Sequence, residues 1–320
     1  MRNIKKEVLS IVICTHNRSN WLATVLETLV SQTAPQEEYE ILVVDNHSED
    51  DTKRIVDGFA PKLPNMRYVY EPEIGLSLAR NRGWKEAHGE YIGYLDDDSK
   101  TPPEWVSAAM DVAIQVAPEA FGGPIFAFYN SPKPAWFKDE YESHVQGNEP
   151  RRLNEDEYLD GGNMFIRRDI LVELKGFNPA LGMAGKKIGL GEETSFIDLL
   201  REKYPDAKIF YEPRLFIFHL ARPEKMDLWQ LPKRFFINGQ YVYRTHTKAH
   251  SVGIFRVFIN ILLAVLRLLK SCTWDLIRRD KNKYPYFQNF LYENSFIYFL
   301  YLGRNFETLL DGKMLWKKNQ

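Results

Sequence analysis

The sequence predicts an α/β fold, a mostly parallel sheet with helices on both faces, followed by a C-terminal helical region. Two observations lead to this prediction. In residues 1–225, short apolar runs alternate with stretches whose apolar residues recur at helical spacing, a pattern typical of βαβ units. Beyond residue 225, long aromatic-rich helical stretches replace that alternation. We therefore expect two parts, 1–225 and 226–320.

The first elements follow from their own patterns. Residues 8–14 are apolar apart from Ser10, as expected of a buried parallel strand. After Ser19 or Asn20, either of which can cap a helix, the apolar residues of 21–30 form one stripe. The same reasoning predicts strands at 41–44, 66–70 and 91–95 and helices at 50–59 and 77–87.

The elements after residue 100 are less regular. The patterns predict helices at 104–116 and 192–203 and strands around 121–129, near 164–166 and, as a pair, across 208–219. Pro213 interrupts that pair, because proline cannot donate a hydrogen bond within a sheet. Residues 130–157 contain the proline, glycine and asparagine typical of a loop.

Composition indicates a globular protein, since 44% of the 320 residues are hydrophobic and 27% are charged. The net charge of −1 is unevenly spread. Residues 1–225 hold 27 Lys/Arg against 37 Asp/Glu, a charge of −10, and residues 226–320 hold 15 against 6, a charge of +9. Two cysteines, Cys14 and Cys272, are too few for a disulfide framework. The N-terminus lacks a signal-peptide core, so we do not expect export.

Three consecutive carboxylates, Asp96, Asp97 and Asp98, follow the strand expected at 91–95. Such groups repel one another and resist burial, so a positive charge should lie beside them. Asp45 ends another expected strand. Because ligands bind at the carboxyl ends of strands in parallel sheets, Asp45 and Asp96 should face the same crevice.

Six segments, taken in chain order, resemble the family-2 glycosyltransferases with a GT-A fold. They are LSIVICTHNR (9–18), ILVVDNHS (41–48), GLSLARNRG (75–83), GEYIGYLDDDSKTP (89–102), GGNMFIRR (161–168) and GLGEET (189–194). The resemblance covers roughly residues 8–222. It implies that 1–225 is a catalytic domain that binds a nucleotide-sugar donor, most commonly a UDP-sugar, and transfers one sugar with inversion to a hydroxyl acceptor. The acceptor would be a saccharide or glycolipid of cell-surface polysaccharide or glycolipid biosynthesis.

The resemblance also assigns roles at the donor. Asp45 matches the residue that accepts a hydrogen bond from the base. The other positions implied to contact the nucleotide sugar are Thr15, Arg18, Arg80, Asp96, Asp97, Gly162 and Arg222. Glycine at 162 would permit close approach of the backbone. Trp136 and Phe137, in the expected loop, are candidates to stack on an acceptor sugar.

A divalent cation is implied at the acidic triplet, which matches the family's DxD motif. We expect Asp98 to be the direct ligand of Mn²⁺ or Mg²⁺, with Asp96 beside it and His219 as a further ligand. Carboxylate oxygens and substrate phosphates suit both ions. The role of Asp97 stays open, and His219 could instead be a structural histidine.

Glu192 and Glu193 match the pair in which the second acid is the catalytic base. The family usually has aspartate at that second position, so the base here is longer by one methylene. A base must approach the acceptor hydroxyl within about 3 Å, which the longer arm still allows. The alternative is that both acids only stabilise a helix N-terminus.

Other functional classes fit less well. A dinucleotide-dependent oxidoreductase is disfavoured because no GxGxxG follows the first strand. A sugar nucleotidyltransferase should have a glycine-rich phosphate loop there, and THNRSN is not one. A non-catalytic nucleotide-sugar-binding protein on the same scaffold is the remaining alternative. Loss of either carboxylate site would favour it, and both are present.

The basic C-terminal region, 226–320, predicts a partner other than the nucleotide sugar and the acceptor. Residues 252–274 are the most hydrophobic stretch, but the apolar core between Arg256 and Arg267 has only about ten residues, too few to span a bilayer. Basic flanks and aromatic neighbours fit a helix that lies in the membrane interface. We expect a cytoplasmic protein at the inner face of the cell membrane, without a nucleic-acid partner. Packing on the catalytic domain or in a homodimer is the alternative.

Overall fold

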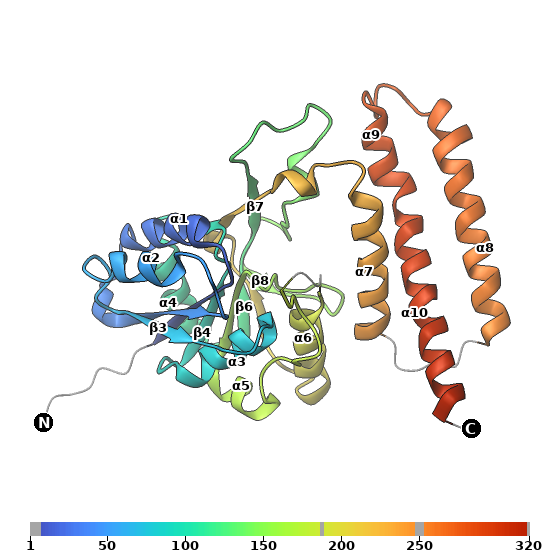
Figure 1. The fold of residues 1–320 in the computed structure, drawn as a ribbon. Helices are drawn as coiled ribbons and strands as arrows, with labels where there is room; N and C mark the ends of the chain where they lie inside the picture. Colours follow the sequence, from blue (N-terminus) through green and yellow to red (C-terminus); the bar gives the residue numbers. More distant parts are fainter. Residues whose placement is uncertain (1–7, 186–188, 247–252, 319–320) are drawn as a thin grey trace, which may run out of the picture. The chain divides into compact units, whose positions relative to one another are not determined.

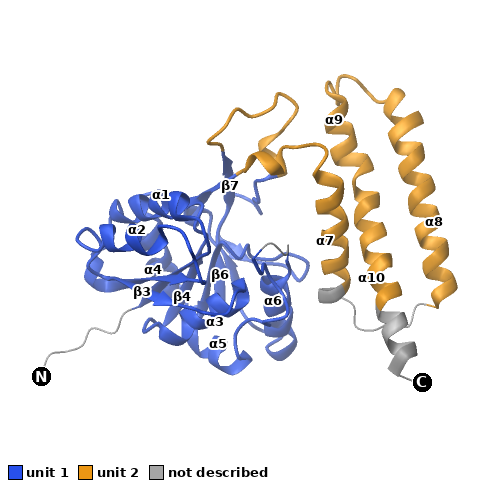
Figure 2. Cartoon of the chain, in the orientation of Figure 1, with its two compact units in different colours: residues 1–128, 142–220 blue, residues 129–141, 221–320 orange. Residues whose placement is uncertain are grey.

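The structure is a computed structural model that describes residues 8–185, 189–246 and 253–318. Within it the chain forms two compact units (Figure 2). The first contains the residues up to Phe128 together with Glu142–Leu220. The second contains Tyr129–Tyr141 and the chain from Ala221 onward. The sequence placed the boundary at residue 225 and did not separate 129–141 from the first part.

An eight-stranded sheet forms the centre of the first unit, in the order β3-β2-β1-β4-β9-β6-β10-β8 (Figure 1). The bounds are β1 Leu9–Thr15, β2 Tyr39–Asp45, β3 Met66–Tyr70, β4 Tyr91–Leu95, β6 Ala120–Gly122, β8 Arg151–Arg152, β9 Asn163–Arg167 and β10 Ile209–Tyr211. Strands β1 to β4 pair in parallel, as the alternating pattern predicted. Strand β9 runs antiparallel to both β4 and β6.

A smaller sheet joins β5 (Ser99–Lys100), β11 (Ile217–Leu220) and β7 (Ile125–Phe128). The single strand expected around 121–129 is thus two strands in two sheets. The chain changes sheet at Gly122, Gly123 and Pro124, where a side chain at Gly123 would overlap the carbonyl oxygen of Leu215. The pair expected across 208–219 is β10 and β11, separated by a short 3₁₀ turn at Pro213–Leu215.

Six helices flank the large sheet in the described part of the first unit: α1 Ser19–Val30, α2 Thr52–Phe59, α3 Leu76–Glu86, α4 Trp105–Gln115, α5 Arg168–Leu174 and α6 Glu192–Lys203. The alternating side chains of β1 show which helices cover each face of the sheet. Leu9, Ile11 and Ile13 belong to a core cluster with α1, α2 and α4, and Val12 belongs to a second cluster with α3, α5 and α6. Successive side chains of a strand point to opposite faces, so both faces of this strand are buried.

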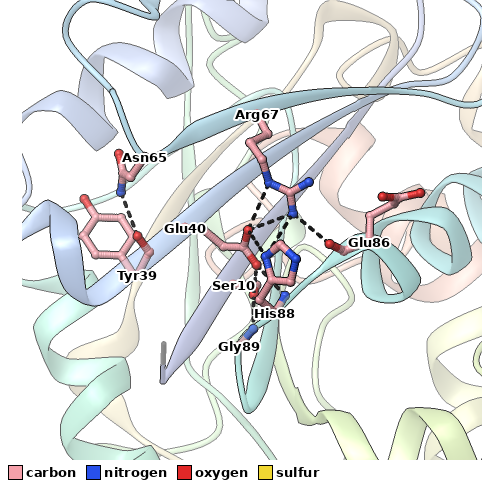
Figure 3. A network of polar contacts seen from close by, with 8 residues as sticks. All are labelled: Ser10, Tyr39, Glu40, Asn65, Arg67, Glu86, His88 and Gly89. Atoms are coloured by element: carbon pink, nitrogen blue, oxygen red, sulfur yellow. Dashed lines mark hydrogen bonds and ion pairs between the residues drawn. The ribbon is translucent and has the colours of Figure 1, made fainter. Parts of the chain in front are cut away.

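A polar network joins the amino ends of the central strands (Figure 3). Glu40 is buried and accepts hydrogen bonds from the Ser10 hydroxyl at 2.7 Å, the His88 backbone N–H at 2.5 Å and Arg67 Nη2 at 2.9 Å. Arg67 also donates to the carbonyl oxygen of Glu86 at 2.7 Å. The network ties β1, β2 and β3 to the turn before β4. It lies at the end of the sheet opposite to Asp45 and Asp96, which follow the carboxyl ends of their strands.

The second unit is helical, with α7 Leu231–His246, α8 Ile254–Lys270, α9 Phe287–Phe290 and α10 Ile297–Lys318. Helix α10 packs against both α7 and α8 (Figure 1). The backbones of α7 and α10 meet at Gly239 and Gly303, where added side chains would overlap carbonyl oxygens of the facing helix. None of the helices in the described ranges is both long and apolar enough to cross a membrane.

Trp136 and Phe137, expected to be available for stacking on an acceptor, are instead buried. They form a core cluster of the second unit with Met226, Leu231 and Phe296. Their aromatic surface is therefore used in packing.

Candidate active site

The acidic triplet lies in the turn between β4 and β5. Strand β5 pairs antiparallel with β11, so that Ser99 is opposite His219. The backbone carbonyl of Asp98 also accepts a hydrogen bond from Leu220 N at 3.1 Å. This pairing brings a histidine from a position 120 residues downstream of Ser99 to the acidic turn, as the register of the two strands shows.

Asp96, Asp98 and His219 form a cluster whose potential ligand atoms all lie within 4.8 Å of one another. His219 Nε2 is 3.2 Å from Asp98 Oδ1 and 3.6 Å from Asp96 Oδ2. Two carboxylates and an imidazole are ligands that Mn²⁺ accepts, and carboxylates also suit Mg²⁺. The donor set therefore fits the implied divalent cation. Burial raises the pKa of Asp96, against the opposing effect of His219 and Arg80.

Asp97 is not part of this cluster and contacts Arg18 instead. Its carboxylate is buried and accepts a hydrogen bond from Arg18 Nη1 at 2.9 Å. Burial raises its pKa to about 6, although the charge of Arg18 acts in the opposite direction. In the described structure Arg18, one of the predicted phosphate contacts, thus holds the middle aspartate of the triplet, while its side chain remains partly exposed.

The predicted base-binding residues Thr15 and Asp45 are neighbours. They end β1 and β2 in register with each other, and both are buried. Asp45 Oδ1 accepts a hydrogen bond from the Ser48 backbone N–H at 2.8 Å, and Oδ2 accepts one from the Tyr68 hydroxyl at 2.7 Å. Tyr68, on β3, was not predicted. The expected pairing of its strand with the strand that ends at Asp45 was the signal that could have indicated this contact.

Arg80 is a buried ion-pair residue. Its guanidinium lies 2.8 Å from Glu192 Oε1 and donates to the carbonyl oxygen of Gly161 at 3.1 Å. Although burial works against its charge, Glu192 and Asp96 hold the pKa of Arg80 above its ordinary value. The pair joins α3 to the start of α6, which fixes where the next residue, Glu193, lies.

Glu193 is in the first turn of α6. Its Oε2 is buried and has no hydrogen-bond partner among the residues that the structure describes. Burial, followed by the charge of Glu192, raises its pKa to about 8, against the opposing effect of Arg80. A carboxylate with a raised pKa is, once ionised, a stronger base, and is suited to accept a proton from a substrate.

The segment before β9 lies beside Asp96 and Arg80. A side chain at Gly162 would overlap Asp96 Oδ2, and one at Gly161 would lie 2.8 Å from Arg80 Nη2. The missing side chain at Gly162 therefore makes room for Asp96. The preceding residue, Asp160, influences the pKa values of both Asp96 and Glu193 through its charge. Asp160 was not predicted from the sequence, although an acid directly before a glycine pair was a usable signal.

Arg222, predicted to contact the nucleotide sugar, belongs to the second unit. It precedes the short 3₁₀ turn Pro223–Lys225 in an extended conformation. The other predicted site residues all belong to the first unit: Thr15, Arg18, Asp45, Arg80, Asp96, Asp97, Asp98, Gly162, Glu192, Glu193 and His219.

Comparison with known proteins gives consistent results. A family model described as "Glycosyl transferase family 2" matches residues 10–175, more than half of the chain. The chain is 27% identical over 261 residues to the succinoglycan biosynthesis protein ExoM of Rhizobium meliloti (strain 1021), covering 80% of each protein. It is 26% identical over 170 residues to glycosyltransferase AglE of Haloferax volcanii, covering 53% of this chain and 55% of that protein.

Two solved structures share the fold. TarS 1–349 of S. aureus in complex with UDP-GlcNAc gives a TM-score of 0.56 at 17% identity, covering 98% of this chain and 92% of that chain. The mannosyltransferase PcManGT of Pyrobaculum calidifontis in complex with GDP-Man and Mn²⁺ gives 0.54 at 14% identity, covering 96% and 79%. The expected GT-A fold is confirmed by these neighbours and by the mostly parallel sheet.

Proposed function

Because the chain belongs to glycosyl transferase family 2, we propose that it transfers a single sugar from a nucleotide-sugar donor to a hydroxyl acceptor, with inversion. The observation that carries this proposal is that Arg80 links two acidic groups of different chemistry. Its guanidinium lies 3.9 Å from Asp96 Oδ1, in the Asp96–Asp98–His219 cluster, and 2.8 Å from Oε1 of Glu192. The residue after Glu192 is Glu193, whose Oε2 has no hydrogen-bond partner among the described residues.

Each group has a task in an inverting transfer. Asp96, Asp98 and His219 would hold a divalent cation, which neutralises the negative charge of the leaving diphosphate when bound. Glu193 would accept the proton of the acceptor hydroxyl as its oxygen attacks the anomeric carbon. Arg80 pairs with Glu192 through Oε1 at 2.8 Å, so we assign the proton transfer to Glu193.

We further propose that the donor is UDP-linked and that the acceptor is a cell-surface saccharide or glycolipid. The TarS complex with UDP-GlcNAc supports the first, although the PcManGT complex holds GDP-Man. The similarity to a succinoglycan biosynthesis protein supports the second. We also propose that the protein acts at the inner face of the cell membrane, which the similarity to a polysaccharide biosynthesis protein and the basic helical unit support.

A donor-hydrolysis screen tests the proposal. The purified protein would be incubated with UDP-, GDP- and dTDP-sugars in Mn²⁺, in Mg²⁺ and in EDTA, and nucleotide release measured. We expect one nucleotide class to be hydrolysed, and EDTA to abolish that activity. Asp98→Asn should remove it as well, whereas Asp206→Asn, the same change at an exposed position, should leave it intact.

Two results would contradict the proposal. Binding of a nucleotide sugar with neither hydrolysis nor transfer to any saccharide would favour the non-catalytic alternative. Full activity of Asp98→Asn in the presence of EDTA would remove the cation from the reaction, even if the protein is a transferase.

A further inference from the structure

A pocket of about 300 Å³ lies in the first unit, near the site already described. Its volume is at the lower end of the range for small-molecule sites. The lining residues are Gly123, Ser143, His144, Val145, Gln146, Tyr158, Leu159, Asp160 and Tyr211. Most come from the irregular segment before β9. Gly123 directly follows β6, and Tyr211 is the last residue of β10.

The polar groups of this pocket are held in place by the fold. Asp160 Oδ2 is 3.1 Å from His144 Nδ1, and its Oδ1 accepts a hydrogen bond from the Gly162 backbone N–H at 3.0 Å. The Tyr211 hydroxyl accepts a hydrogen bond from Gln146 N at 3.1 Å. His144 is itself fixed by two backbone hydrogen bonds with Ile125, at 3.0 and 2.8 Å. The Asp160 side chain nevertheless remains 31% exposed and can reach a ligand.

The lining indicates a neutral polyhydroxyl ligand. The described residues that line the pocket offer a carboxylate, an imidazole, an amide and two phenol rings, but neither a lysine nor an arginine. A phosphate group would lack a fixed cation among these described residues. A sugar ring instead offers hydroxyls for the carboxylate and amide and an apolar face for a tyrosine ring.

The position of the pocket in the sheet also indicates a sugar ligand. The predicted nucleotide contacts Thr15 and Asp45 lie on β1 and β2, and the acidic triplet follows β4. Gly123 and Tyr211 lie at β6 and β10, beyond β4 in the sheet order. Only Gly161 separates Asp160 from Gly162, whose Cα faces Asp96. The pocket is therefore on the side of the acidic triplet away from the nucleotide contacts, where sugar chemistry should occur.

We propose that this pocket binds a sugar ring of the transfer reaction, with Asp160 accepting hydrogen bonds from its hydroxyls and His144 positioning that carboxylate. The inference rests on the proposed function. The sugar can be that of the donor or that of the acceptor, because the same hydroxyl chemistry serves both. Asp160 would then determine which sugar is accepted.

Two binding measurements distinguish these sources. Calorimetry would compare UDP with the UDP-sugar that the hydrolysis screen identifies, in Mn²⁺. Saturation-transfer NMR would follow methyl glycosides of glucose, galactose, mannose and N-acetylglucosamine with UDP and Mn²⁺ present. The variants are Asp160→Asn and His144→Gln, with Asp156→Asn as the matched control at an exposed position of the same segment.

If the donor sugar occupies the pocket, Asp160→Asn should weaken UDP-sugar binding roughly tenfold, the scale of a lost hydrogen bond to a charged group, and leave UDP binding unchanged. If the acceptor sugar occupies it, donor binding should be unchanged, and glycoside saturation should fall for both pocket variants but not for Asp156→Asn. Wild-type behaviour of both pocket variants in both arms would overturn the inference while leaving the transferase intact. Failure of every nucleotide sugar to bind would instead overturn the proposed function.

Discussion

At the scale of single residues, environment separates carboxylates that are alike in the sequence. Asp97 is bound by Arg18, whereas Asp96 and Asp98 face His219. Glu192 and Glu193 differ in the same way, since only Glu192 pairs with Arg80. In each case one acid accepts a short hydrogen bond from an arginine, and we propose that its neighbour takes part in the chemistry. This division follows from burial, because a second unpaired carboxylate beside the first would raise the cost of ionisation for both.

Glu193→Gln should lower turnover by a factor of about 100 or more, because general-base catalysis is lost, with donor binding close to normal. The pH dependence gives a second readout. The pKa of Glu193 is raised to about 8, so the active, deprotonated form is depleted as pH falls below 8. The wild-type kcat/KM should therefore rise with pH toward that value, and the residual rate of Glu193→Gln should lose this dependence.

Glu192→Gln is the comparison that locates the base. It breaks the buried pair with Arg80, so its main effect should be on thermal stability. If Glu192→Gln removes turnover without changing the melting temperature, and Glu193→Gln is mild, then the base is one residue earlier than we propose.

At the scale of elements, a few long-range contacts hold the sheet in the arrangement that forms the site. Glu40, at the start of β2, gathers donors from β1, β3 and the turn before β4 at the end of the sheet away from the acidic triplet. At the other end, the pairing of β5 with β11 brings in His219. We expect the first contact to serve stability and the second to serve chemistry, so changes to them should have separable effects.

Glu40→Gln should lower the free energy of unfolding by about 2 kcal/mol, because it leaves buried donors without their charged acceptor. Arg67 is partly exposed, which keeps the loss below that of a fully buried ion pair. Glu37→Gln, at an exposed position just before β2, is the control and should change stability little. Urea unfolding of both variants measures the difference.

Acid should remove the advantage of the wild type over Glu40→Gln. Although burial opposes it, hydrogen bonds from His88 N, Ser10 and Arg67 hold the pKa of Glu40 below its ordinary 4.5. A depressed carboxylate pKa stabilises the fold above the unfolded value, and the contribution is lost as pH falls through the folded value. The two unfolding curves should therefore converge below pH 4.5. A constant difference down to strongly acidic pH would show that the carboxylate charge is not the cause.

At the scale of the whole molecule, the described structure combines an acidic α/β unit with a basic helical one. Helix α8 presents a wide apolar face, with Phe255, Phe258 and Leu262 each more than half exposed. Its buried residues Val257 and Ala264 fall on a separate, narrow stripe. Arg256, Arg267 and Lys270 border the apolar face, and the sequence has no acid from 252 to 274. An amphipathic helix with such flanks suits the surface of an anionic membrane.

We expect the full-length protein to sediment with vesicles that contain anionic lipid. Each basic side chain near the surface contributes about 1 kcal/mol and is screened by salt, whereas the apolar face adds a part that salt does not remove. Binding should thus weaken, without vanishing, as salt rises. Leu262→Glu should abolish binding at high salt, and Asn260→Glu, the same added charge off the apolar face, should weaken it only at low salt.

A second result would contradict membrane binding by α8. If the protein ignores vesicles of every composition and Leu262→Glu converts a dimer to a monomer in sedimentation velocity, the apolar face of α8 is a subunit contact. The catalytic proposal is unaffected by either result, because its residues lie in the first unit.

Local patterns in the sequence determined the β-α alternation, the position of the acidic triplet and the start of α6. Strands 66–70 and 91–95 and the helix at 192–203 have the predicted bounds, because periodicity and flanking turn residues are short-range signals. The order of the motifs was sufficient for the family, since each motif is contiguous.

Only the tertiary structure decided what these segments meet. The antiparallel placement of β9, the approach of His219, the Arg80–Glu192 pair and the His144–Asp160 pocket all join residues that are distant in the chain or lie in irregular segments. No local periodicity encodes such contacts. They form because the buried sheet admits few arrangements in which both faces are covered and the buried polar groups are paired.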